Sequence, residues 1–147
     1  MEKEIDMKVI MLKGASHKGK TMTLRMVFEK LKSLDAELDP NFKNVPIPPK
    51  GDFGYKLNYN GKNIYINTGG DTAQHIFWVM GHAEGLGCNV CIVANSNKNS
   101  PIIFAEERHG LSNRIIVKKT IAKSKADEND ANEKDRDEII FTHLAEV

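Results

Sequence analysis

Apolar residues along the chain form runs with strand-like and helix-like spacing. Residues 7–13 contain the run Val9-Ile10-Met11-Leu12, which is typical of a strand buried on both faces of a parallel sheet. A second continuous run at residues 89–94 predicts another central, parallel strand. Between them, apolar residues recur at helical spacing and predict one apolar stripe, made of Leu24, Val27, Phe28, Leu31 and Leu34.

Residues 53–67 have the pattern of a β-hairpin. Apolar and polar or small residues alternate over 53–59, which predicts a half-buried strand. Asn60-Gly61 is the strongest short-range signal for a hairpin turn, and residues 62–67 form the partner strand. We expect the two strands to pair antiparallel, with strand 62–67 beside strand 7–13.

The remaining pattern completes an α/β arrangement. Helices are expected over residues 72–84 and 101–109, and a fifth strand over 114–118. Strands that alternate with helices favour a mostly parallel sheet. We expect five strands in the order 2-3-1-4-5 with one antiparallel edge strand, in a single domain over residues 1–147.

Two polar segments interrupt this pattern. Residues 35–51 are rich in proline, which is expected to prevent regular structure. Residues 124–132 are polar and mostly acidic, and are expected to lack fixed structure. From Glu133 a helix is expected to dock on the sheet, unless this tail binds a protein partner. The residues able to dock are Ile139, Ile140, Leu144 and Phe141.

Composition excludes several classes of partner and location. The net charge of +1 provides no overall field that favours nucleic acid or an anionic membrane. No apolar run approaches the ~20 residues of a membrane span. Residues 1–6 are too acidic and polar for a signal peptide. We therefore expect a cytoplasmic protein.

Cysteine and histidine residues give no metal-site pattern. Cys88 and Cys91 are spaced C-x-x-C, but they fall in or next to an apolar strand. We expect them to point to opposite faces of the sheet as core residues. His75 and His82 share a predicted helix face without a third ligand, so surface or hydrogen-bonded histidines are expected.

The strongest chemical signal is Gly14-Ala15-Ser16-His17-Lys18-Gly19-Lys20-Thr21, which fits G-x-x-x-x-G-K-[ST] without departures. Glycines let the backbone bend until successive N–H groups face phosphate oxygens. In this order Lys20 can reach the outer phosphates and the Thr21 hydroxyl can ligate Mg²⁺. The helix that follows adds its positive dipole end to the same anion.

With a strand before it and a helix after it, this motif resembles the small P-loop nucleoside triphosphatases, most strongly over residues 7–34. The resemblance implies a three-layer P-loop NTPase-like fold that binds ATP and Mg²⁺, with residues 35–51 as a candidate lid or plain connector. It implies that the triphosphate is bound by Gly14, Ala15, Ser16, His17, Lys18, Gly19, Lys20 and Thr21.

The stretch Asn67-Thr68-Gly69-Gly70-Asp71-Thr72 follows the hairpin. P-loop enzymes hold Mg²⁺ with an acidic residue near the end of a neighbouring strand. The resemblance therefore makes Asp71 a metal ligand with Thr21, Gly70 a point of backbone approach to the γ-phosphate, and Lys20 and Asp71 the catalytic candidates. A helix N-cap is the alternative role for Asp71, and the two roles are compatible.

Other functions stay open at this point. A GTPase-like switch would need an aspartate where Asn67 stands, and residues 95–99 contain no aspartate to pair with guanine, so ATP is favoured by elimination. Hydrolysis or transfer of the γ-phosphate is expected, with a non-enzymatic, nucleotide-gated interaction module as the alternative. Asn95 is a candidate to orient water or phosphate. Lys118 and Lys119 are expected to be solvated strand-end charges, with a position near the nucleotide as the alternative. Trp78 packs on a neighbouring helix or forms a homodimer patch.

Overall fold

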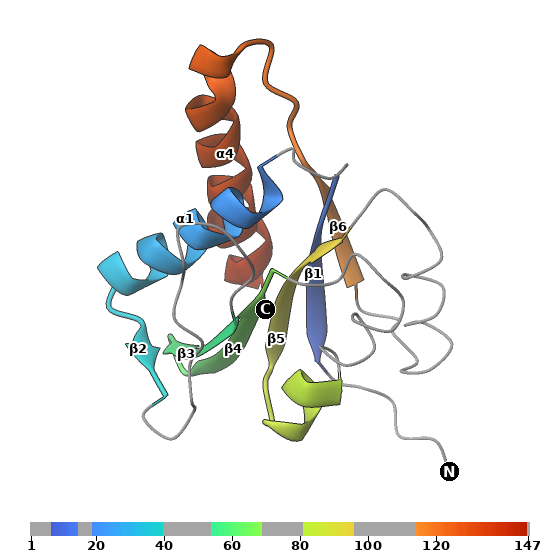
Figure 1. The fold of residues 1–147 in the computed structure, drawn as a ribbon. Helices are drawn as coiled ribbons and strands as arrows, with labels where there is room; N and C mark the ends of the chain where they lie inside the picture. The colour runs from blue at the N-terminus through green and yellow to red at the C-terminus, as the bar shows by residue number, and fades with distance from the viewer. Residues whose placement is uncertain (1–6, 15–18, 40–53, 69–80, 96–113, 147) are drawn as a thin grey trace.

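The computed structural model describes residues 7–14, 19–39, 54–68, 81–95 and 114–146 (Figure 1). These residues form an α/β fold with one mixed sheet in the order β2-β3-β4-β5-β1-β6. The pairs β4–β5, β5–β1 and β1–β6 are parallel, whereas β2–β3 and β3–β4 are antiparallel. The strands are β1 (Lys8–Lys13), β2 (Glu37–Leu38), β3 (Gly54–Tyr59), β4 (Lys62–Asn67), β5 (Val90–Asn95) and β6 (Arg114–Lys118).

The hairpin is confirmed, but the expected strand order is wrong. Strands β3 and β4 pair antiparallel around Asn60 and Gly61, whose φ angles are 52° and 78°. Strand β4 then pairs with β5, from Ile64 opposite Val90 to Asn67 opposite Val93, and not with β1. Strands joined by a crossover usually lie side by side, so β4 and β5 are neighbours and β1 lies between β5 and β6.

A short strand occupies part of the segment that was expected to lack regular structure. Glu37 and Leu38 form β2, which pairs with Asn58 and Leu57 of β3. Strand β2 therefore forms the antiparallel edge, and β3, expected at the edge, is covered. Residues 40–51 of this proline-rich segment lie outside the described residues.

One face of the sheet is covered by α1 (Lys20–Ser33) and the C-terminal helical segment (Figure 1). The α1 stripe is confirmed, because Leu24, Val27, Phe28 and Leu31 are buried and Leu34 packs against their cluster. Ile139, Ile140 and Leu144 join the same core as expected, whereas Phe141 is 55% exposed. The segment consists of η1 (Lys125–Asp127), α4 (Glu128–Asp137), η2 (Glu138–His143) and η3 (Leu144–Glu146).

The C-terminal helix begins earlier than the polar pattern indicated. Residues 124–132 were expected to lack fixed structure, yet η1 occupies Lys125–Asp127 and α4 begins at Glu128. Ala131, Asn132 and Asp135 are buried. Contacts with the rest of the protein thus stabilise a helix that its own acidic, polar sequence does not favour.

The opposite face of the sheet carries a second core that includes both cysteines. Cys88 and Cys91 belong to the same cluster, so the expectation that they point to opposite faces is wrong. Strand β5 begins only at Val90, and strand alternation therefore does not extend back to Cys88. Burial raises the pKa of both thiols, that of Cys88 to about 11, which keeps them protonated core residues.

Residues 81–85 are helical, and Ala83 packs in this second core. The remainder of the expected helix, residues 72–80, and the expected helix at 101–109 lie outside the described residues, as do His75 and Trp78. Within the described part, no helix combines the length and apolar character needed to cross a membrane.

Candidate functional site

The two ends of the glycine motif lie where a phosphate-binding loop requires them. Gly14 follows β1 directly, is buried, and donates its N–H to the Asn95 carbonyl over 3.1 Å. Gly19 has φ 87° and is the N-cap of α1, which begins at Lys20. The motif thus connects the carboxyl end of a central parallel strand to the N-terminus of a helix. Ala15, Ser16, His17 and Lys18 lie outside the described residues.

Lys20 extends back from α1 toward the sheet. Its side chain is buried, and Nζ donates a hydrogen bond to the Asn95 carbonyl oxygen over 3.0 Å. This contact places the ammonium group at the carboxyl end of β5, beside that of β1. Asn95 contributes to the site through its backbone carbonyl, and its side chain is fully buried.

The first turn of α1 suits an anion. Thr21 is the second residue of the helix and is half-buried. This turn contains no acidic residue, and its N-cap, Gly19, has no side chain that could cap the helix. The positive end of a helix dipole attracts anions.

Both bounding glycines lack room for a side chain. A Cβ atom at Gly14 would lie 2.8 Å from Lys119 Cβ. At Gly19 it would lie 2.9 Å from Asn132 Oδ1, and the left-handed φ adds backbone strain for any other residue. Glycine at these two positions is therefore favoured by close neighbours, Lys119 directly after β6 and Asn132 in α4, as well as by the turn at Gly19.

Lys119 is buried, which corrects the expectation that both strand-end lysines are solvated. Its Nζ forms an ion pair with Asp135 Oδ2 at 2.8 Å and donates to the Thr120 carbonyl over 2.9 Å. Asp135 also accepts from the Thr120 N–H and hydroxyl, at 2.8 and 2.6 Å. Lys118, by contrast, is exposed. The Lys119 side chain thus supports both glycines while Asp135 neutralises its charge.

A second contact joins α4 to the loop. The Thr23 hydroxyl donates to the Gly19 carbonyl over 2.8 Å and lies 3.1 Å from Asn132 Oδ1. Sequence reasoning missed Asn132 and Asp135 because they stand in an acidic, polar stretch. Their spacing of three places them on one helix face, which is the signal that could have indicated a buried polar edge.

The end of β4 is also polar and buried. Asn67 stands where a GTPase-like switch would have an aspartate. Its Nδ2 donates a hydrogen bond to the Tyr65 hydroxyl over 3.0 Å. That hydroxyl lies 3.1 Å from His82 Nδ1, so His82 is hydrogen-bonded as expected. Burial raises the pKa of Tyr65. Gly70 and Asp71 lie outside the described residues.

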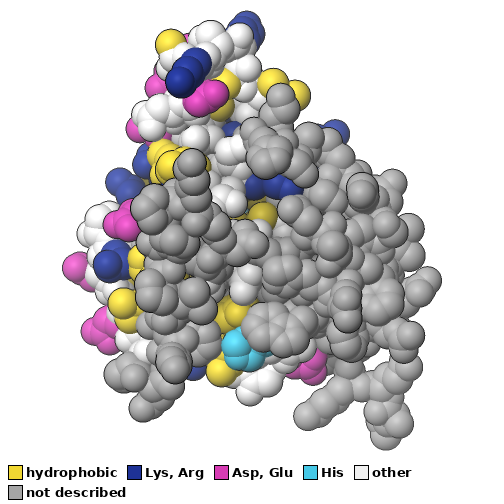
Figure 2. Space-filling view, viewed as in Figure 1, with side chains coloured by type: hydrophobic (Ala, Val, Ile, Leu, Met, Phe, Trp, Pro, Cys, Tyr) yellow, Lys and Arg dark blue, Asp and Glu magenta, His cyan; other side chains and the backbone are white. Residues whose placement is uncertain are grey.

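Charge on the surrounding surface is mixed. Figure 2 shows described Lys and Arg side chains interspersed with Asp and Glu over α1 and α4. On this face, the described residues therefore form no broad basic surface. Among the described residues, no three His, Cys, Asp or Glu side chains gather into a metal-binding group.

No family model, curated protein or solved structure matches this sequence. The function must therefore be argued from the geometry of the site itself.

Proposed function

We propose that the chain binds Mg²⁺-ATP through the loop Gly14–Thr21 and hydrolyses or transfers the γ-phosphate, within a three-layer P-loop NTPase-like fold. The position of the Lys20 amine carries this proposal, because it lies at the carboxyl ends of two central parallel strands. Ligands of open α/β sheets bind at that edge. Although the strand order differs from the expected one, β1 still has a parallel neighbour on each side.

Each residue of the site has a separate role in this proposal. Lys20 stabilises negative charge on the outer phosphates, and the loop amides orient the phosphate chain. Thr21 and Asp71 hold the metal. The role of Asp71 is inferred from the sequence alone. When bound, Mg²⁺ neutralises charge on the phosphate oxygens.

Calorimetric titration with Mg²⁺-ATP and Mg²⁺-GTP, followed by phosphate-release assays, tests the proposal. Wild type should bind ATP, and Lys20→Met should weaken this by at least about tenfold, since a charge-assisted hydrogen bond is lost. Lys30→Met, at the other end of α1, is the matched control and should bind normally. Unchanged affinity of Lys20→Met, or no binding by wild type, would contradict the proposal.

The same titrations separate the alternatives. Selective binding of GTP would favour a GTPase-like switch. Binding that depends on Lys20, without phosphate release or transfer, would favour a nucleotide-gated interaction module.

A further inference from the structure

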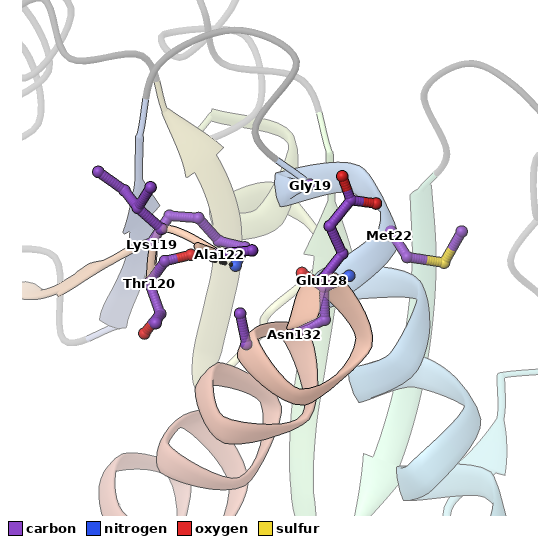
Figure 3. A pocket seen from close by; sticks show the side chains of 9 residues that line it. Gly19, Met22, Lys119, Thr120, Ala122, Glu128 and Asn132 are labelled. Atoms are coloured by element: carbon purple, nitrogen blue, oxygen red, sulfur yellow. Dashed lines mark hydrogen bonds between the residues drawn. The ribbon is translucent and has the colours of Figure 1, made fainter. Parts of the chain in front are cut away.

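A hollow of about 350 Å³ opens beside Gly19 (Figure 3). Its walls come from the first turn of α1, the start of α4 and the chain that follows β6. Figure 3 shows Met22 on the α1 side, Thr120 and Ala122 on the side of β6, and Glu128 and Asn132 on α4. The volume lies within the range of roughly 300–1,000 Å³ that is typical of small-molecule sites.

Two apolar side chains at this hollow are left in solvent. Met22 is 45% exposed and Ile121 is 75% exposed, and both line the hollow. Single exposed apolar residues are common, but a pair at one concave site is typical of a surface that receives an apolar or planar ligand. Ala122 and Ala131 add small apolar surfaces between them.

The hollow and the Lys20 amine lie toward different neighbours of β1. Lys20 Nζ contacts the end of β5, whereas the hollow adjoins the end of β6. Strand β1, from which the loop starts, lies between these two strands. If the loop lysine binds the outer phosphates as proposed, the hollow on the β6 side is open to the group attached to the inner phosphate.

The charge at the hollow indicates what that group is. Glu128 brings a carboxylate to the lining, which repels phosphate oxygens and accepts hydrogen bonds from hydroxyl or amino groups. A nucleoside has such donors on its ribose and base, together with a planar heterocycle. A second phosphate group or a dicarboxylate would be excluded by the same carboxylate.

We infer that this hollow binds the nucleoside of the bound triphosphate, with the base against its exposed apolar side chains, Met22 or Ile121, and a ribose or base donor at Glu128. The inference rests on the proposed function, because the triphosphate must bind at the adjoining loop. It assigns a specificity site to side chains of α1, α4 and the chain after β6 that the phosphate motif does not contain.

Comparing Mg²⁺-ATP with Mg²⁺-tripolyphosphate, which lacks the nucleoside, tests this inference in the full chain. The double variant Met22→Ala/Ile121→Ala should bind ATP about tenfold more weakly and tripolyphosphate as wild type does. Phe141→Ala, an exposed apolar residue away from the hollow, should leave both affinities unchanged. Thermal unfolding checks that each variant is folded.

The outcomes distinguish the two proposals. If neither ligand binds to wild type, the proposed function and the nucleoside site both fail. If tripolyphosphate binds in a Lys20-dependent way but ATP binds no more tightly, or if the double variant binds ATP normally, the nucleoside site fails and the phosphate site stands. Equal loss of both ligands in the double variant also overturns the nucleoside site.

Discussion

Lys119 and Asp135 form an ion pair of 2.8 Å in the protein interior, with side chains only 2% and 3% exposed. The pair joins the chain after β6 to α4 beside Gly14 and Gly19, the two glycines that flank the glycine loop. Asp135 is further held by the Thr120 N–H and hydroxyl. The loop is therefore supported by a network that the phosphate motif does not include.

Replacing one member of this ion pair should strongly destabilise the fold. Lys119→Met and Asp135→Leu should each lower the free energy of unfolding by roughly 3–5 kcal/mol, because each leaves a buried charge without its counter-ion. The double variant should lose less than the sum of the two. Urea unfolding of all three variants measures this coupling.

The neighbouring pair of Arg136 and Asp137 provides the control, because Asp137 is 48% exposed. Asp137→Asn should change stability by less than about 1 kcal/mol. Additive losses in the Lys119 and Asp135 variants would show that the two side chains do not stabilise each other.

Gly14→Ala should destabilise the protein and weaken nucleotide binding. The new Cβ would lie 2.8 Å from Lys119 Cβ, so the loop or the strand end must shift. Overpacking of this kind costs about 1–3 kcal/mol. Gly85→Ala is the matched control, because its Cβ would meet nothing within 4 Å, and it should leave stability unchanged or raised. Equal melting temperatures for the two variants would contradict the contact.

Ionisation of the Cys88 thiol should lower the stability of the protein at alkaline pH. Burial raises the pKa of its thiol from 9.0 to about 11. The unfolded chain therefore loses this proton at lower pH than the folded protein. The stabilisation is complete below pH 9 and is lost as pH rises through about 11.

Urea unfolding of wild type and Cys88→Ala at pH 8 and pH 11 measures this contribution. The fall in stability between the two pH values should be smaller in the variant by roughly 2 kcal/mol. An identical fall in both proteins would exclude Cys88 as its source.

The proposed metal role of Thr21 and Asp71 predicts a selective effect of two substitutions. Thr21→Val and Asp71→Asn should weaken binding of ATP in the presence of Mg²⁺, while binding measured with EDTA persists, because the lost group contacts the metal. Titration under both conditions measures the difference. If Asp71→Asn reduces both equally and also lowers the melting temperature, Asp71 is a helix cap alone.

Local sequence patterns were sufficient to predict the strand and the helix on either side of the glycine loop. The apolar run of β1, the stripe of α1 and the Asn60-Gly61 turn each predict one local structure, and all three are confirmed. The ends of the glycine motif follow, because a strand and a helix fix where Gly14 and Lys20 lie.

Long-range relationships could not be predicted in the same way. Pairing of β4 with β5 depends on contacts between strands, which the period of either strand does not encode. Glu37 and Leu38 are both exposed and show no strand pattern. Lys119, Asn132 and Asp135 have the sequence signature of solvated residues. Their burial follows from long-range contacts, of Lys119 with Asp135 and of Asn132 with Thr23.

The contact between Thr23 and Asn132 spans 109 positions of the chain. During synthesis, the glycine loop and its lysine therefore leave the ribosome long before the helix that steadies them. A nascent chain that ends ahead of α4 lacks the contacts that Asn132 and Asp135 make beside the glycine loop. If the loop binds a nucleotide as proposed, this ability should arise late in translation, together with final folding.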